Sequence, residues 1–583
     1  MSLRRPECVA STRQVVAAAL VLLVLGTLGA IQAVRAGTSF MFDLEQDRPA
    51  LARATPAIEE TGTPRLARRV FLVVIDGLRL DRSYELPYLD ELRRLGVDTE
   101  ASSHYPSYSR PNYVSILTGV PPIASGVRTN HHSSVVLLDS LMDRAHAAKL
   151  RVALATDYDV LPRLFLRPPY PGPSEDVDAG GDDSPEPTSI HDPDANLVSP
   201  FDDARYAPWP GGFAEAGAAL VGHKADLVVM LVGAVDAAGH EHGGDSKEYR
   251  EAAVAADRAV ARALAKADLA QDAVVITADH GHTGRGGHGG VEPEVLTVPL
   301  ILAGAGVAPG VAAVDAQLID IAPTVAALLG IPAPGHGLGR TLTELLALDG
   351  HAVDRRKSGD QARLVATRSI LATAEAAAAT DVLAHRAERL ALVAGGALLA
   401  VGLAIVLIRR HVLRLRLRVL AVSIPAFFIV YYGLIGTFGQ AFSPSLAPAN
   451  GHLVGSLAKY GIAGMLVQVL ASLWELRGEG SIEPHAPAGV LRAAPAQRSL
   501  SARLAAANGI AWTNLMVSML TAGLMWAFFP PPYVTVPGPL WLVLIPAVEV
   551  AVACAAVQAA LTLGVELIIF AARAWHRVHP PLG

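Results

Sequence analysis

The sequence predicts an α/β domain, built on a mixed but mostly parallel sheet flanked by helices, together with an all-α region of membrane-spanning helices. Three observations support this prediction. Short buried runs alternate with amphipathic segments between residues 69 and 345, three of these runs end in Asp, and long apolar segments occupy both ends of the chain. The 583 residues are 51% hydrophobic with a mean hydropathy of +0.36, which is too apolar for an ordinary soluble protein.

The first apolar segment, Val15–Val34, is long enough to span a bilayer and follows Arg4, Arg5 and Arg13. We interpret it as a membrane anchor rather than a cleaved signal peptide, because the run is long and no cleavage site of small residues ends it. About five further spans are expected near the C-terminus, and these are Leu390–Ile408, Val419–Phe438, Tyr460–Leu476, Ile510–Phe529 and a long one within Leu540–Ala572. The sequence therefore predicts a multi-pass protein of the cell membrane.

Arginine is concentrated in alternate loops between these spans. Segments 409–418 and 477–503 and the end of the chain after residue 572 are rich in Arg, whereas loops 439–455 and 530–539 carry almost no positive charge. By the positive-inside rule, both termini are cytoplasmic and the region 35–388 lies outside the cytoplasm.

Two carboxylates, Glu549 and Glu566, fall within the last span. A carboxylate inside a membrane is by default a candidate functional residue. We expect Glu566 to lie near the interface, whereas the role of Glu549 stays open. Pro546 makes a tilt or a break of this long segment plausible.

Three predicted strands are followed by side chains of the kind that bind metals. Arg69–Ile75 precedes Asp76, Asp226–Gly233 precedes Asp236 and His240, and Asp272–Thr277 precedes Asp279, His280 and, after a Gly-rich loop, His288. Open α/β sheets build their sites at the carboxyl ends of strands.

These six side chains divide into two sets of three, and carboxylate oxygens with imidazole nitrogens suit zinc or a related divalent ion. Two such ions about 3.5–4 Å apart can hold the attacking and leaving oxygens of a displacement at phosphorus. The alternatives are that Asp76 caps the next helix, and that residues 279–288 form a polar surface loop that happens to contain three histidines.

The segment His104–Gly119 is a candidate source of a nucleophile. Pro111 suits the first turn of a helix, which puts Ser109 near the N-cap, beside free backbone N–H groups that can bind an anion. A capping Ser is the alternative. Ser109 becomes a nucleophile only where a metal or a base makes its proton easier to remove.

The remaining elements complete the alternating pattern. Further strands are expected at 151–156 and 298–303, and amphipathic helices at 87–96, 135–150, 246–266 and 320–331, with an acidic, Pro- and Gly-rich surface insertion at Pro168–Pro200. We expect five segments: an anchor at 1–35, a tether at 36–68, an extracytoplasmic catalytic domain at 69–345, a helical linker at 346–388 and a membrane domain at 389–583.

Composition argues against other classes of function. The net charge of −6 gives no indication of nucleic-acid binding, and none is expected. The only two cysteines, Cys8 and Cys554, lie in or beside apolar segments and do not indicate a disulfide framework.

The region from about 69 to 345 resembles the alkaline phosphatase superfamily, in its type I phosphodiesterase/nucleotide pyrophosphatase branch. The motifs that carry this resemblance are VVIDG, SRPNYVSILTG, VDAAGHEHG, ADHGHTGRGGHGG and DIAPTVAALLGI. The SRP element and the GGHGG stretch are also similar to the GPI ethanolamine-phosphate transferases, which pair an extracytoplasmic catalytic domain with a multi-span membrane region.

The resemblance implies roles for the matching residues. One zinc would be held by Asp76, Ser109, Asp279 and His280, and the other by Asp236, His240 and His288. Ser109 would attack phosphorus to form a covalent phospho-enzyme intermediate, and Asn112 would help to hold a phosphate oxygen. Many phosphodiesterases of this branch have Thr in place of Ser109, and the transferases usually have Gly in place of Asn112. We interpret His242 and His282 as neighbours of the ions or as substrate contacts, with a surface role as the alternative.

Other activities fit the sequence less well. A sulfatase needs C/S-x-P-x-R, and Tyr113 stands at the Arg position. A cofactor-independent phosphoglycerate mutase would be soluble, and a transporter or scaffold with an inactive enzyme domain would not need a complete ligand set. The sequence thus predicts a metal-dependent phosphodiesterase or phosphotransferase acting on a phosphodiester or a lipid head group, with an ethanolamine-phosphate-type transferase as the alternative.

Overall fold

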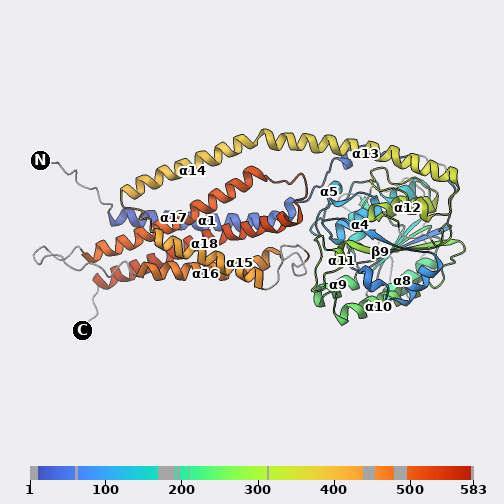
Figure 1. The fold of residues 1–583 in the computed structure, drawn as a ribbon, viewed down its shortest axis with the longest axis horizontal. Coiled ribbons are helices and arrows are strands. Elements are labelled where there is room, and N and C mark those ends of the chain that lie inside the picture. Colours follow the sequence, from blue (N-terminus) through green and yellow to red (C-terminus); the bar gives the residue numbers. More distant parts are fainter. Residues whose placement is uncertain are drawn as a thin grey trace, which may run out of the picture.

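The computed structural model describes residues 11–59, 63–167, 191–192, 197–207, 209, 211–310, 314–437, 445, 453–477 and 495–578. Most of the predicted insertion Pro168–Pro200 therefore lies outside the described residues. Figure 1 shows an α/β part beside a long bundle of helices. Helix α1 (Thr12–Asp43) begins, and helix α18 (Pro539–Val578) ends, at the end of the bundle that is remote from the α/β part.

An eight-stranded sheet forms the centre of the α/β part. Its strands follow the order β10-β2-β9-β8-β1-β7-β3-β6. In that order they span Ala316–Gln317, Val97–Ser102, Thr297–Gly304, Asp272–Thr277, Arg69–Ile75, Leu227–Val232, Val152–Thr156 and Asp203–Tyr206. Strand β9 runs antiparallel to β2 and β8, and the other pairs are parallel. The predicted mixed, mostly parallel sheet is confirmed.

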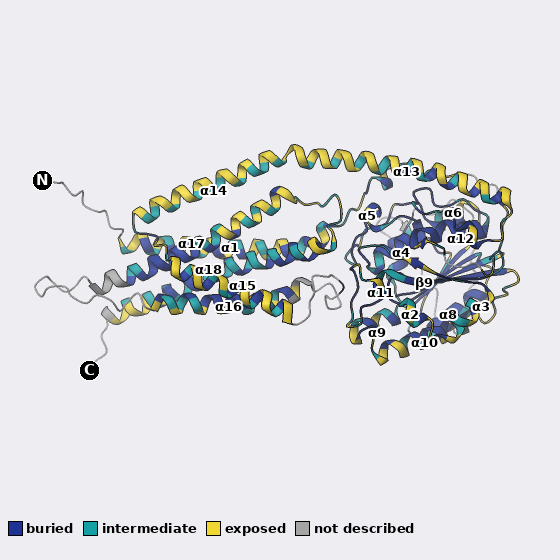
Figure 2. Cartoon of the chain, in the orientation of Figure 1, coloured by how far each residue is buried: buried dark blue, intermediate teal, exposed yellow. Residues whose placement is uncertain are grey.

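Helices cover both faces of this sheet, with α4 and α12 on one side and α8 and α10 on the other (Figure 1). The helices of this part are α2 (Leu80–Ser83), α3 (Pro87–Leu95), α4 (Ser109–Thr118), α5 (Pro122–Ser125), α6 (Leu141–Ala147), α7 (Val160–Leu164), α8 (Gly211–Gly222), α9 (Ala234–His242), α10 (Lys247–Ala263), α11 (Pro293–Leu296) and α12 (Ile321–Leu329). Because both faces are covered, strands β3, β7 and β8 are buried along their whole length. Figure 2 shows this interior as the most continuously buried region of the molecule.

Two local features differ from the sequence expectation. Residues 97–102 form β2, whose alternating Val97, Thr99 and Ala101 are buried while Glu100 and Ser102 face solvent. The polar residues Asp98, Thr99, Glu100 and Ser102 interrupt the apolar pattern that marks the other strands. The amphipathic stretch 135–150 is helical only over α6, because Ser140 caps the helix and its side chain accepts from the backbone N–H of Asp143.

Six helices among the described residues are long and apolar enough to cross a membrane. They are α1, the continuous helix formed by α13 (Gly350–Ala384) and α14 (Arg386–Arg409), α15 (Leu417–Thr437), α16 (Leu453–Arg477), α17 (Pro495–Phe528) and α18. Helix α1 continues past the apolar segment that ends at Val34, and α18 passes through Pro546 without interruption. The chain has the helices of a multi-pass membrane protein.

Helix α13 is attached to the α/β part by a polar face. Arg356 and Arg363 are buried, and their guanidinium groups donate to backbone carbonyls, Arg356 to that of Ile331 at 2.8 Å. Asp360 accepts from the backbone N–H of Thr341 at 2.6 Å. The helix that enters the membrane as α14 is therefore fixed to the globular part at its other end.

Buried polar side chains join the membrane helices to one another. Arg503 of α17 and Glu566 of α18 form two parallel hydrogen bonds, both 2.6 Å long, and both residues are buried. The amides of Gln468, Asn514 and Gln558 form a second connected group across α16, α17 and α18. The sequence did not identify a partner for Glu566, and the structure supplies Arg503.

The α/β part contacts the near end of the bundle through backbone carbonyls and a small apolar cluster. Arg128 is fully buried, and its guanidinium donates to the carbonyls of Leu44, Tyr533, Ile123 and Val534. These contacts join the end of α1 and the loop between α17 and α18 to the turn after α5.

The segment that leads into α4 takes part in the same junction. Tyr105 donates from its hydroxyl to the carbonyl of Pro537 at 2.6 Å. Tyr105 and Tyr108 pack against an apolar cluster from the ends of α1 and α18, which comprises Phe40, Met41, Leu44, Leu542 and Ile545. The N-terminal end of α4 thus lies against the bundle.

Candidate active site

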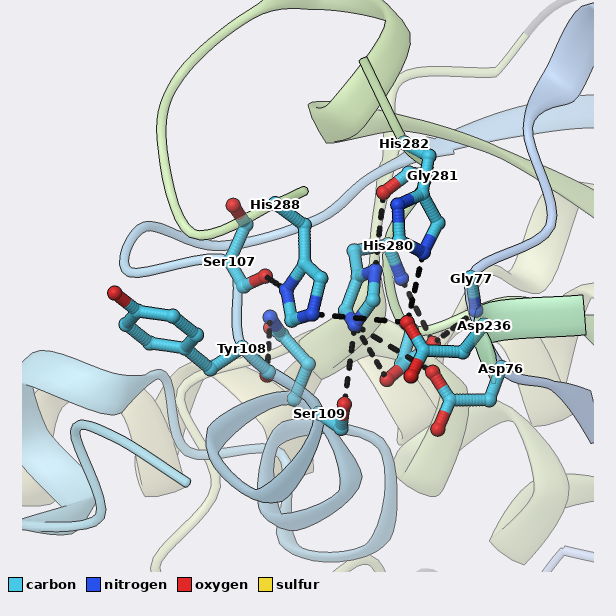
Figure 3. A network of polar contacts seen from close by, with 12 residues as sticks. Asp76, Gly77, Ser107, Tyr108, Ser109, Asp236, His280, Gly281, His282 and His288 are labelled. Atoms are coloured by element: carbon cyan, nitrogen blue, oxygen red, sulfur yellow. Dashed lines mark hydrogen bonds and ion pairs between the residues drawn. The ribbon is translucent and has the colours of Figure 1, made fainter. Parts of the chain in front are cut away.

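Three strands that are followed by Asp lie next to one another in the sheet. Strand β1 lies between β7 and β8 and runs parallel to both, so the residues after these strands meet at one edge. Asp76 follows β1, Asp236 lies in α9 after β7, and Asp279 follows β8. Figure 3 shows the side chains of this edge gathered around His280, with Ser109 in contact with the His280 ring. All seven residues of the predicted metal set are brought together.

The first cluster contains Ser109, Asp76, Asp279 and His280. His280 Nε2 lies 3.1 Å from Ser109 Oγ, 3.5 Å from Asp76 Oδ1 and 3.3 Å from Asp279 Oδ2. All four residues are buried. A carboxylate pair, an imidazole and a hydroxyl therefore face one small space.

The second cluster contains Asp236, His240 and His288. His240 Nε2 lies 3.4 Å from Asp236 Oδ2 and 3.0 Å from His288 Nε2, and His288 Nε2 lies 3.6 Å from Asp236 Oδ1. Asp236 and His240 both belong to α9, so the Gly-containing stretch after β7 that holds them is a helix rather than a loop. Because the two residues are four apart on a helix, their side chains still share one face.

Backbone contacts decide which ring nitrogen is free in two of the histidines. His280 Nδ1 lies 3.1 Å from the carbonyl oxygen of Gly281, and His288 Nδ1 lies 2.8 Å from that of Ser107. Because a carbonyl only accepts, each Nδ1 carries the hydrogen and each Nε2 presents a lone pair to its cluster. Both histidines are thus oriented as metal ligands are.

Both clusters fit a four-coordinate divalent ion. Ligands about 2.0–2.1 Å from a tetrahedral ion lie about 3.3 Å from one another. The distances within the two clusters range from 3.0 to 3.6 Å. Asp76 Oδ1 and Asp279 Oδ2 are buried without a hydrogen-bond partner among the described residues, which leaves two carboxyl oxygens facing the space that a cation would fill.

The electrostatics of the site also favour a cation. Burial, together with the charges of Asp279 and Asp236, raises the pKa of Asp76 well above its usual value. Burial also raises the pKa of Asp236, but the hydrogen bond from His282 and the nearby histidines outweigh it and hold that pKa below its usual range. Burial and the charge of His280 lower the pKa of His288, which favours its neutral, metal-binding form.

Ser109 is the first residue of α4, and Tyr108 is the N-cap. Fewer backbone N–H groups are free to bind an anion at this end of the helix than we expected. The N–H of Arg110 donates to Asn130 Oδ1 at 3.0 Å, Pro111 has no N–H, and that of Asn112 donates to the Tyr108 carbonyl at 3.2 Å. In the described first turn, this leaves the N–H of Ser109 for a phosphoryl oxygen.

Tyr113 and Ser107 support the site although sequence reasoning gave neither a role. The hydroxyl of Tyr113 donates to Asp76 Oδ2, and Tyr113 lies four residues after Ser109 on the same face of α4. Ser107 accepts from the N–H of Gly289 at 2.8 Å and donates to the carbonyl of Gly290 at 2.9 Å. The i to i+4 spacing from Ser109 could have identified Tyr113, whereas the contact of Ser107 with a loop about 180 residues away leaves no local signal.

Of the two additional histidines, only His282 belongs to the site. His282 Nε2 lies 2.8 Å from Asp236 Oδ1, and the residue is fully buried. The His242 side chain is 40% exposed and lies 3.7 Å from Glu241 at the end of α9. The structure therefore supports the surface alternative for His242.

Asn112 lies close to the site, but its side chain is directed at the backbone. Its Nδ2 donates to the carbonyls of His104 and Tyr108, both at 3.2 Å, and its Oδ1 accepts from the N–H of His104 at 3.3 Å. The residue is fully buried. These contacts tie the segment before Ser109 to α4.

We expect Asn112→Ala to lower the melting temperature of the protein, because the backbone N–H and carbonyl of His104 lose their partner and each unpaired buried group costs about 1–3 kcal/mol. The kcat of the folded fraction should change by no more than about threefold, a change of under 1 kcal/mol in the barrier. Thermal unfolding and kcat, measured on the same preparation, check this. An unchanged melting temperature with a large loss of kcat would instead support the phosphate contact that the resemblance implies.

Comparison with known proteins identifies the α/β part. Residues 70–285 match the family model of the type I phosphodiesterases and nucleotide pyrophosphatases. A GPI ethanolamine phosphate transferase 1 from Emericella nidulans is 28% identical over 337 residues, covering 48% of this chain and 34% of that protein. Its counterpart from Mus musculus is 26% identical over 341 residues, covering 51% and 35%. The chain thus spans about a third of the length of these curated relatives.

Two solved structures are also similar to part of this chain. Murine ectonucleotide pyrophosphatase/phosphodiesterase 5 has a TM-score of 0.37 and 13% identity, covering 48% of this chain and 100% of that one. The alkaline phosphatase PafA has a TM-score of 0.36 and 13% identity, covering 49% and 99%. The family model confirms the resemblance seen in the motifs, and residues 70–285 are a phosphodiesterase-type domain.

Proposed function

From the phosphodiesterase-type domain at residues 70–285, we propose that the protein is a membrane-bound, two-metal enzyme that transfers a phosphoryl group from a phosphodiester to Ser109. The observation that carries this proposal is the first cluster, where a serine hydroxyl shares one metal-sized space with Asp76, Asp279 and His280. The donor set of carboxylate oxygens and imidazole nitrogens favours Zn²⁺.

Each residue of the site has a distinct task. Asp76, Asp279, His280 and Ser109 would hold one ion, and Asp236, His240 and His288 would hold the other. Two bound ions supply Lewis acidity, which makes the Ser109 hydroxyl easier to ionise and offsets the charge on the phosphoryl and leaving oxygens. Tyr113 keeps Asp76 in position through its hydroxyl, and Ser107 keeps His288 in position through its carbonyl.

The chemistry proceeds by two displacements at phosphorus. Ser109 Oγ forms a bond to phosphorus while the bond to the leaving alcohol breaks, and that alcohol takes up a proton. Because the donor is a diester, the intermediate on Ser109 is itself a diester that keeps the second alcohol of the substrate. Water or an acceptor alcohol then attacks its phosphorus, and the proton that this nucleophile loses is taken up by Ser109 Oγ as its bond to phosphorus breaks. Hydrolysis and transfer differ only in the second nucleophile.

The substrate we favour is a lipid phosphodiester. The segment before Ser109 packs on the ends of α1 and α18, and the N–H of Gly290, two residues after His288, donates to Ser445 Oγ at 2.7 Å. These contacts set the site beside the membrane helices. The arginine distribution supports cytoplasmic termini and an extracytoplasmic catalytic domain.

The transferase alternative has its own support. The relatives named above are GPI ethanolamine phosphate transferases, and they match about half of this chain. In this version of the proposal, the second nucleophile is the alcohol of a glycan or lipid rather than water.

The test uses the full chain, purified in detergent and reconstituted into vesicles. We expect about two divalent ions per chain and cleavage of bis-p-nitrophenyl phosphate that a chelator abolishes and Zn²⁺ restores. With a phospholipid labelled in its head group, a water-soluble labelled product indicates hydrolysis, and label on a second lipid or glycan indicates transfer. A chain that binds no metal and cleaves neither substrate would contradict the proposal.

A further inference from the structure

Space for the His282 ring is provided by two glycines. A Cβ atom at Gly239 would lie 2.5 Å from His282 Cδ2, and one at Gly77 would lie 3.1 Å from the same atom. The ring is fully buried. Two separate segments of backbone, after β1 and within α9, therefore make room for this imidazole.

The His282 ring is the opposite tautomer to the rings of His280 and His288. The N–H of Gly287 donates to His282 Nδ1 at 3.2 Å. Because a backbone N–H only donates, Nδ1 holds a lone pair and the neutral ring carries its hydrogen on Nε2. His280 and His288 carry theirs on Nδ1.

The Gly-rich loop holds the Gly287 N–H, which sets the tautomer of His282, in position. Gly286 and Gly287 have φ angles of +95° and +96°, in the region that favours glycine. The Thr283 hydroxyl donates to the carbonyl of Gly286 at 2.8 Å, and the Thr283 N–H donates to that of Gly287 at 3.1 Å. The turn is therefore closed with the Gly287 N–H directed at the imidazole.

From these contacts we infer that His282 is a positioning residue, which donates from Nε2 to Asp236 Oδ1 and is not itself a metal ligand. The Nε2–Oδ1 distance is 2.8 Å. This hydrogen bond leaves Asp236 Oδ2, which lies 3.4 Å from His240 Nε2, to face the second cluster. The inference rests on the proposed two-metal function and deepens it.

Distance alone does not reveal this role. Asp236, His240 and His282 have ligand-type atoms within 4.8 Å of one another, so His282 could be taken for a third imidazole ligand of the second ion. A neutral ring with hydrogen on Nε2 has no lone pair to offer there. Partners that orient a ligand in this way typically raise metal affinity about 10–100-fold.

The experiment compares three substitutions in the full chain in detergent. His282→Gln keeps a donor near the Nε2 position, His282→Leu removes it at similar volume, and His240→Gln removes a proposed ligand. Zinc affinity is measured by chelator competition, stoichiometry by metal analysis, and geometry by the visible spectrum of the cobalt-substituted protein.

We expect His282→Leu to retain two ions at saturating zinc, with the weaker site bound on the order of 10–100-fold less tightly. His282→Gln should restore affinity and the cobalt spectrum to near wild type, whereas His240→Gln should bind one ion fewer. If both His282 variants lose one ion as His240→Gln does, His282 is a ligand and the inference fails. It fails equally if His282→Leu binds both ions with unchanged affinity and spectrum.

These outcomes separate the inference from the proposed function. If the wild-type chain binds no metal, the proposed function itself fails, whatever His282 does. If His282→Leu does not fold, His282→Gln alone decides, because loss of an imidazole ligand weakens zinc binding and preservation of a donor does not. Thermal unfolding of each variant shows which case applies.

Discussion

Ser109→Ala should lower the rate of phosphodiester cleavage by a factor on the order of 10⁴ or more, because the substitution removes the atom that bonds to phosphorus. Metal content should stay near two ions, since Asp76, Asp279 and His280 remain to hold the first one. The measurements are the initial rate with bis-p-nitrophenyl phosphate and metal analysis of the same sample. A brief incubation with labelled substrate should leave label on the wild-type chain and none on the variant.

Two further variants serve as controls for the Ser109→Ala experiment. Ser115→Ala makes the same substitution on the same helix, where the hydroxyl donates to the carbonyl of Pro111 at 3.1 Å, and it should keep most of the activity. Ser109→Thr keeps a hydroxyl nucleophile and should also remain active. Full activity of Ser109→Ala would mean that another group attacks phosphorus.

Arg503→Met should destabilise the protein by about 3–5 kcal/mol, because it leaves Glu566 buried without its partner. Glu566→Leu should have a similar effect for the converse reason. Thermal unfolding in detergent provides the measurement, with retention of the folded fraction on size-exclusion chromatography as the second readout.

The double variant tests whether the unpaired buried charge causes the loss of stability. Arg503→Met with Glu566→Leu removes both charges, and replacement of a buried ion pair by apolar groups is often neutral or stabilising by about 1–4 kcal/mol. The double variant should therefore be more stable than either single one. If the three variants unfold at the same temperature as the wild type, the ion pair contributes nothing to the fold.

The central strands and most ligand positions could be predicted because their signal is local. The runs before Asp76 and Asp279 are mostly apolar, as is typical of strands buried on both faces, and a parallel sheet brings their ends together. Strand β2 could not be predicted in this way, because its alternating polar residues resemble a loop unless the partner strand β9 is known.

The contacts that refine the site depend on distant segments, so a local pattern does not reveal them. Asn112 matches a family motif, yet its amide bonds to the backbone of His104 and Tyr108. The different roles of His280 and His282, two residues apart, follow from which backbone group meets each ring. Both residues are histidines in the same short motif, so their type and spacing do not tell a metal ligand from a positioning residue.

The α/β part is held by three separate connections: the end of α1, the loop between α17 and α18 bound by Arg128, and the polar face of α13. A body attached at three places cannot swing on one hinge. These contacts then hold Ser109 at a fixed distance from the membrane helices. In the proposed orientation, the enzyme would discriminate among substrates by how far their phosphate projects from the membrane surface, before any head group is recognised.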